Sequence, residues 1–304
     1  MQHRSQSAME YLTTYGWLIM IIAVVLVVLF ELGVFNASNF EPKAQPGACY
    51  VYRPDGPGTT KFINFAGECS GRLPKFVAQL NGNGGNVTIL TNRVLATGNT
   101  ITMTAWVKWN SGKHLTGGCC GSRQEVFGTD SSPTAEINPI IAINDSGTGE
   151  AETWVCTTGG CWNEAKSASG YIVPNVWYFM ASRYNGTAVS IWIDGSMVAE
   201  TTDSGTLNLQ GSGLYTYIGS RGGAGSFFNG SVANAQMYNT ALSSNAIAGL
   251  YGEGIGGTPI DLQNLLGWWP LNGNAKDYGG NGYNGKTSAG LTFTSSWTDG
   301  YTVP

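Results

Sequence analysis

The feature that most constrains this chain is an uncharged apolar run close to its N-terminus. The run extends from Tyr11 to Phe30, is rich in Ile, Val and Leu, and contains no proline. About twenty such residues suffice for a helix to cross a hydrocarbon layer of about 30 Å. A helix is also the economical way to satisfy backbone polar groups in lipid. We therefore expect a transmembrane helix at this end of the chain.

The short leader before this run sets it apart from an ordinary secretory signal. Such a signal is cut after its apolar core, whereas the expected cut here lies before the core, between Ser5 and Gln6. The cut would leave the helix on the mature chain, with Glu10 near its start. A carboxylate there is costly unless it is paired, and the α-amino group of Gln6 on a neighbouring subunit is a natural partner. The alternative is an uncleaved anchor with Glu10 in the headgroup region.

The segment Gln6-Ser7-Ala8-Met9-Glu10-Tyr11-Leu12 resembles the class III signal peptide of archaeal type IV pilin-like proteins. The resemblance covers roughly residues 5–35. It implies that a prepilin peptidase cuts before Gln6 and that Glu10 serves in filament assembly.

Composition and prolines divide the rest of the chain. We expect a leader peptide at 1–5, a transmembrane or filament-core helix at 6–35, a linker at 36–48 that contains Pro42 and Pro46, and a head at 49–304. Only 11% of the 304 residues are charged and 44 are glycine, which is typical of a turn-rich β protein outside the cell. The net charge of −4 argues against a nucleic-acid partner, which would favour a basic surface.

The head shows the period of two that predicts strands. Apolar and polar residues alternate over 101–109, and similar strands are expected at 177–184 and 188–193. Asp194-Gly195 predicts a tight hairpin turn. One short helix is expected from Ser243, its cap, to Tyr251, with Gly252 ending it.

These strands resemble a laminin-G-like, concanavalin A-like jelly roll over about residues 75–252. The resemblance is carried by 100–107, by the hairpin 177–195 and by 228–243. A further segment, Leu265 to Gly282, resembles the part that normally opens such a domain. We therefore expect a mainly β sandwich, circularly permuted, in which 265–304 completes the sheet and Trp268 and Trp269 pair into it.

Six cysteines follow the apolar run, and an even number beyond a membrane segment predicts disulfides. Cys156 and Cys161 flank Thr-Thr-Gly-Gly, as the two cysteines of a disulfide across a hairpin would. A Cys49–Cys69 disulfide would close a local loop. The adjacent Cys119 and Cys120 could bond to each other or to the other cysteines. A zinc site with His114 is a weaker alternative.

The candidate catalytic and binding residues of the head are acids, amides and tryptophans. Glu150 and Glu152 are the closest match to the paired acids of a glycanase, but the favoured interpretation is two solvated hairpin charges. We therefore predict no enzyme activity. The oxygen-rich cluster of Asn274, Asp277 and Asn281 could bind Ca²⁺ or could hydrogen-bond its own turn. The Trp side chains could stack on sugars, although most should be core.

Five N-x-S/T sequons mark candidate sites of N-glycosylation. Asn185 and Asn229 lie where turns are expected, and the full set is Asn36, Asn86, Asn144, Asn185 and Asn229.

The sequence thus predicts a type IV pilin-like surface protein. A membrane or filament-core helix would present an extracellular head that binds glycans or proteins, either as a filament subunit or as a tip adhesin. The alternative is a membrane-anchored monomeric carbohydrate-binding protein, and a polysaccharide hydrolase is a distant third.

Overall fold

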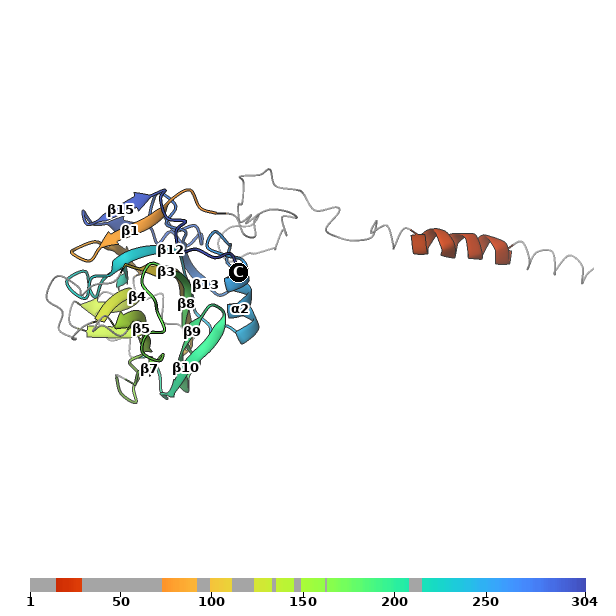
Figure 1. Cartoon of the computed structure of the whole chain (residues 1–304). Coiled ribbons are helices and arrows are strands. Elements are labelled where there is room, and N and C mark those ends of the chain that lie inside the picture. Colours follow the sequence, from red (N-terminus) through yellow and green to blue (C-terminus); the bar gives the residue numbers. More distant parts are fainter. Residues whose placement is uncertain are drawn as a thin grey trace, which may run out of the picture. The chain divides into compact units, whose positions relative to one another are not determined.

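The strands of the head pair into two antiparallel sheets (Figure 1). The computed structural model describes residues 15–28, 73–91, 99–110, 123–132, 135–144, 149–161, 163–207 and 215–304. The chain divides into two compact units, one containing the N-terminal helix and the other containing the head.

Sheet A has eight strands within the described residues, and most of its side chains are buried on both faces. Its order is β10 (Ser196–Thr202), β9 (Ala188–Ile193), β8 (Trp177–Tyr184), β3 (Ile101–Trp109), β12 (Asn229–Tyr238), β1 (Val77–Asn81) and β15 (Leu291–Thr294), with β13 (Leu265–Trp269) also paired to β12.

Sheet B has seven strands in the same described part of the chain. Its order is β14 (Gly285–Thr287), β2 (Val87–Leu90), β11 (Tyr215–Ile218), β4 (Arg123–Ser132), β5 (Ala135–Asn144), β6 (Glu150–Trp154) and β7 (Ala165–Lys166). The expected mainly β sandwich is confirmed.

Alternate side chains of the two sheets fill the space between them. Met103 and Val107 of β3 share this core with Ile141 and Ile143 of β5, because successive strand residues point to opposite faces. The predicted strands 101–109, 177–184 and 188–193 match β3, β8 and β9.

The outer face of sheet A is covered by a second, aromatic layer. Helix α2 (Ser244–Gly252) places Tyr251 against Trp106, with ring centroids 5.8 Å apart. Tyr301, near the C-terminus, contacts Trp106 from another side at 5.4 Å. This layer explains why Thr102, which alternates with the core residues of β3, is also buried.

The helix and the predicted turn agree with the sequence analysis, with one correction. The Ser243 side chain accepts a hydrogen bond from Ala246 N at 3.1 Å, as an N-cap does. Asp194 and Gly195 adopt φ of 50° and 77°, which is the conformation of a two-residue hairpin turn. Gly252 does not end the helix but is its last helical residue. The left-handed residue beyond the helix is Gly254, with φ of 76°.

The C-terminal segment is built into both sheets. β13 pairs with the second half of β12, and β1 pairs with the first half. β15 and β14 then pair with β1 in sheet A and with β2 in sheet B. Trp297 Nε1 donates to Pro74 O at 3.2 Å, so the segment also contacts the residues just before β1. The circular permutation itself stays a prediction.

The N-terminal unit contains a helix at residues 15–28. Among the residues that the structure describes, no helix combines the length and the hydropathy that a membrane crossing requires. Several predicted positions lie outside the described residues: Ser5, Gln6, Glu10, the linker 36–48, His114, Cys49, Cys69, Cys119 and Cys120. The predicted Cys156–Cys161 disulfide is confirmed, with Cα atoms 4.2 Å apart.

We predict that Trp269→Ala strongly destabilises the head. Trp269 is fully buried, meets Phe127 edge-on with ring centroids 6.0 Å apart, and donates from Nε1 to Tyr283 O at 2.7 Å. Removing a buried tryptophan typically costs about 3–5 kcal/mol. Urea denaturation of the full chain in detergent measures this cost.

Tyr171→Ala is the matched control, because Tyr171 is 42% exposed and an exposed substitution typically changes stability by less than about 0.5 kcal/mol. Equal midpoints for the two variants would contradict the role given to the C-terminal segment.

Candidate functional site

The outer face of sheet B carries a small group of aromatic and apolar side chains, of which Tyr215 and Leu90 are exposed. In β11, Ile218 points into the core, so Tyr215 and Tyr217 point outward. In β2, Val87 and Ile89 belong to the core, so Thr88 and Leu90 point outward. The strand alternation therefore brings these four side chains to one face.

Strand pairing places them next to one another. Tyr215 lies opposite Leu90, Tyr217 lies opposite Thr88, and Lys286 of β14 lies opposite Thr88 from the other side. Directly opposed residues in an antiparallel pair have side chains on the same face. We call these five residues the tyrosine face.

The tyrosine face is open to solvent at one end. Tyr215 is 36% exposed and Leu90 is 47% exposed, whereas Tyr217 is buried. The two tyrosine rings lie 6.1 Å apart, with an angle of 37° between their planes. An exposed ring beside hydroxyl groups and an ammonium group can stack on an apolar surface and hydrogen-bond to polar groups around it.

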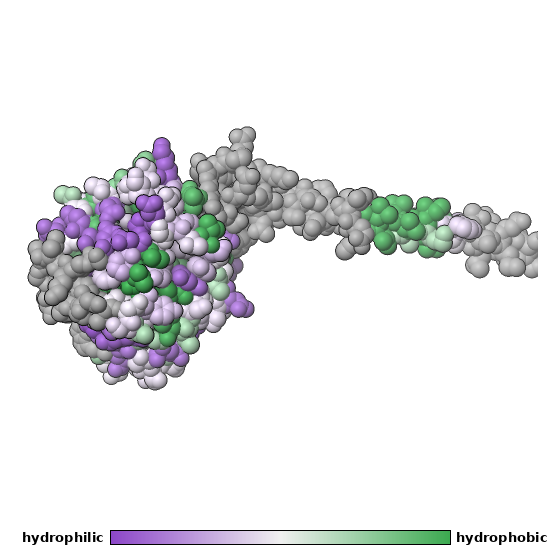
Figure 2. All heavy atoms as spheres, in the orientation of Figure 1, coloured by the Kyte–Doolittle hydropathy of each residue, from purple (hydrophilic) through white to green (hydrophobic). Residues whose placement is uncertain are grey.

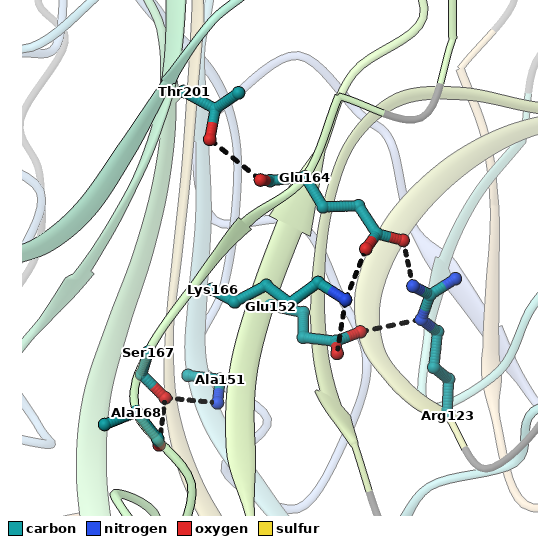
Figure 3. A network of polar contacts seen from close by, with 8 residues as sticks. All are labelled: Arg123, Ala151, Glu152, Glu164, Lys166, Ser167, Ala168 and Thr201. Atoms are coloured by element: carbon teal, nitrogen blue, oxygen red, sulfur yellow. Dashed lines mark hydrogen bonds and ion pairs between the residues drawn. The ribbon is translucent and has the colours of Figure 1, made fainter.

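Further along sheet B, four charged side chains form a closed network (Figure 3). Glu152 of β6 accepts from Arg123 Nε at 2.6 Å and lies 3.7 Å from Lys166 Nζ. Glu164 pairs with the same two cations, at 2.6 Å from Lys166 Nζ and through Arg123 Nη2. Each of the two carboxylates therefore forms an ion pair with both cations.

The prediction that Glu152 is a solvated hairpin charge is wrong. Glu152 is fully buried in a strand, directly opposite Lys166 in the register of β6 and β7. Arg123 lies over the Trp154 ring at 4.8 Å on this face. Glu152 can be buried because its oppositely charged neighbours offset the free-energy cost of removing the carboxylate from water.

This network is a poor match for a glycan-cleaving pair. Such enzymes place two carboxyl groups on either side of the bond to be cut, so both need access to substrate. Glu152 has no exposed surface, and each carboxylate is neutralised by Arg123 and Lys166. The arrangement links β4, β6 and β7 instead.

The three candidate Ca²⁺ ligands lie in one turn, where they bond to backbone groups. Asp277 Oδ1 accepts from Trp268 N and Gly279 N, and Oδ2 accepts from Tyr283 N at 3.0 Å. Asn274 Oδ1 accepts from the backbone N of Lys276, and Asn281 Nδ2 donates to two carbonyls of β13. Within the described residues, no group of three His, Cys, Asp or Glu side chains could hold a metal ion. The Ca²⁺ site stays a prediction.

The expectation that most tryptophans belong to the core is confirmed for the described residues, whereas the tyrosines were not foreseen from the sequence. Every tryptophan that the structure describes in the head is buried: Trp106, Trp109, Trp154, Trp177, Trp192, Trp268, Trp269 and Trp297. The available signal was Tyr215-Thr216-Tyr217, where two aromatic residues separated by one residue share a face of any strand.

The sequons also occupy different environments. Asn185 is exposed between β8 and β9, Asn229 is half-buried at the start of β12, and Asn86 is buried. Asn144 ends β5, and its side chain lies outside the described part of the structure, as does Asn36.

Comparison with known proteins agrees with the sandwich. Residues 81–248 match a laminin G family model described as the concanavalin A-like lectin/glucanases superfamily. No curated protein sequence is significantly similar to the chain.

Many solved structures are similar to this chain, including the following two. One, from Bacteroides ovatus, is described as a candidate carbohydrate-binding protein; it is 17% identical with a TM-score of 0.52, and the match covers 73% of this chain and 60% of that protein. The other is the heptameric SAP-like pentraxin of Limulus polyphemus, 10% identical over 75% of this chain and 96% of the pentraxin, with a TM-score of 0.43.

The first similarity supports the fold alone, and the second is too low to carry an argument. The chain spans about 60% of the length of the Bacteroides protein. The family match covers more than half of the 304 residues, and the two sheets have the expected antiparallel arrangement. The chain therefore belongs to the concanavalin A-like lectin/glucanases superfamily.

Proposed function

We propose that this protein is a type IV pilin-like surface protein of an archaeon whose head binds glycans through the tyrosine face. The observation that carries the glycan proposal is the exposed pair of Tyr215 and Leu90 on an outer sheet face, beside Tyr217. No catalytic step is proposed.

Two further features support glycan binding. The superfamily includes lectins by its description, and a solved structure with the same fold is described as a candidate carbohydrate-binding protein. The tyrosine face also combines a ring surface with the Thr88 hydroxyl and the Lys286 ammonium group, which suits a sugar with one apolar face and a polar rim.

The filament proposal rests on the N-terminal segment. The helix at 15–28 is hydrophobic along nearly all of the face shown in Figure 2. A helix that is apolar all round belongs in a membrane or in a protein core. We infer that a prepilin peptidase cuts between Ser5 and Gln6, and that Glu10 pairs with the new amino group of a neighbouring subunit. The helix thus serves first as a membrane anchor and then in the filament core, with the head outside the cell.

The Cys156–Cys161 disulfide fits this location, because disulfides persist in oxidising environments. A monomer that stays anchored in the membrane would present the same head without the cut before Gln6. The size of the head favours a minor or tip subunit.

We predict that Tyr215→Ala abolishes most glycan binding. Loss of one stacking ring costs about 1 kcal/mol or more of binding free energy. This cost corresponds to a roughly five- to tenfold larger dissociation constant. The measurement is binding of the full chain in detergent to an array of neutral and acidic oligosaccharides, followed by titration of the best glycan.

Tyr171→Ala serves as the control, since Tyr171 is similarly exposed but lies between β7 and β8, outside the tyrosine face. No glycan bound by the wild-type chain, or equal binding by the Tyr215 variant, would contradict the proposal.

A further inference from the structure

The turn between β8 and β9 presents one asparagine side chain in a defined way. Asn185 is exposed, and its Oδ1 accepts hydrogen bonds from Thr187 N at 3.0 Å, Thr187 Oγ1 at 3.0 Å and Ala188 N at 2.9 Å. The side chain is therefore fixed through its oxygen alone, and no described hydrogen bond uses Nδ2.

Among the residues that the structure describes, only Asn99 atoms lie near the ideal Cβ position of Gly186, at 3.6 and 3.7 Å, and Gly186 itself has φ of +94°. Asn185-Gly186-Thr187 is also a sequon. The hydroxyl that the sequon requires is the group that bonds to the Asn185 amide.

The other described sequons lack this combination. Asn86 is buried, and its Nδ2 donates to Ser220 Oγ at 3.0 Å. A glycan on Asn86 would require both the burial and this hydrogen bond to be lost. Asn229 is half-buried inside the paired region of β12.

We propose that Asn185 carries an N-linked oligosaccharide. Nδ2 forms a bond to the anomeric carbon of an oligosaccharide on a polyprenyl phosphate carrier. The bond from that carbon to the carrier oxygen breaks, the carrier leaves with its phosphate, and the amide proton passes to a base of the transferring enzyme. The inference rests on the extracellular head of the proposed function.

The modified turn keeps its three hydrogen bonds, because all of them end on Oδ1. The glycan would stand on a turn of sheet A, whereas the tyrosine face belongs to sheet B. Modification and glycan recognition therefore use different surfaces and can be tested separately.

The test is peptide mass spectrometry of the full chain made in its own cells, with wild-type, Asn185→Asp and Thr187→Ser forms. Asn185→Asp keeps an oxygen for the same three donors and removes the amide nitrogen, while Thr187→Ser keeps the hydroxyl. Protease shaving of intact cells reports in parallel whether the head is outside. Thermal unfolding in detergent verifies that each variant is folded.

The expected result is a sugar mass on the Asn185 peptide of the wild-type and Thr187→Ser chains, its complete loss in Asn185→Asp, and an unmodified Asn86 peptide. A head outside the cell with an unmodified Asn185 peptide would overturn this inference and leave the proposed function standing. A head inside the cell would overturn the proposed function, and an unmodified Asn185 peptide in that case would overturn both.

Discussion

The structure depends on the pairing of β12, which holds strands from both ends of the head. One edge of β12 pairs with β3, and the other pairs with β1 and then with β13. Between these partners the register shifts at Asn234, which has φ of 49°. The Asn234 side chain accepts from Trp268 Nε1 at 2.7 Å and donates to Gly257 O at 2.9 Å. A buried polar network of this kind favours one arrangement of the strands, because any other would leave a buried polar group without a hydrogen bond, at a large cost in free energy.

This closure covers the outer face of sheet A, whereas part of the outer face of sheet B is exposed. The chain that follows β12 forms α2 and the C-terminal tail, and both cover sheet A with aromatic side chains such as Tyr251 and Tyr301. On sheet B, Tyr215 and Leu90 stay exposed. A ligand surface is therefore proposed on sheet B and not on the sheet that carries more aromatic residues.

Local signals predicted the elements well, and long-range contacts account for what was missed. The alternation in 101–109, the Asp194-Gly195 turn and the Ser243 cap all depend on neighbouring residues, and the structure agrees with them. Glu152 is different, because its burial depends on Arg123, which is 29 residues away. The tyrosine face was missed for a related reason: alternation shows which residues share a face, but not which of them stay exposed.

We propose that one chain joins a processed filament helix to a glycan-binding head, and the N-terminus of the mature protein gives the most direct test. The measurement is N-terminal peptide mass spectrometry of material sheared from the surface of the cells that make the protein. We predict a mature chain that begins at Gln6 in the sheared fraction, with Glu10 as its fifth residue. An intact chain that begins at Met1 and is confined to membranes would contradict the filament account.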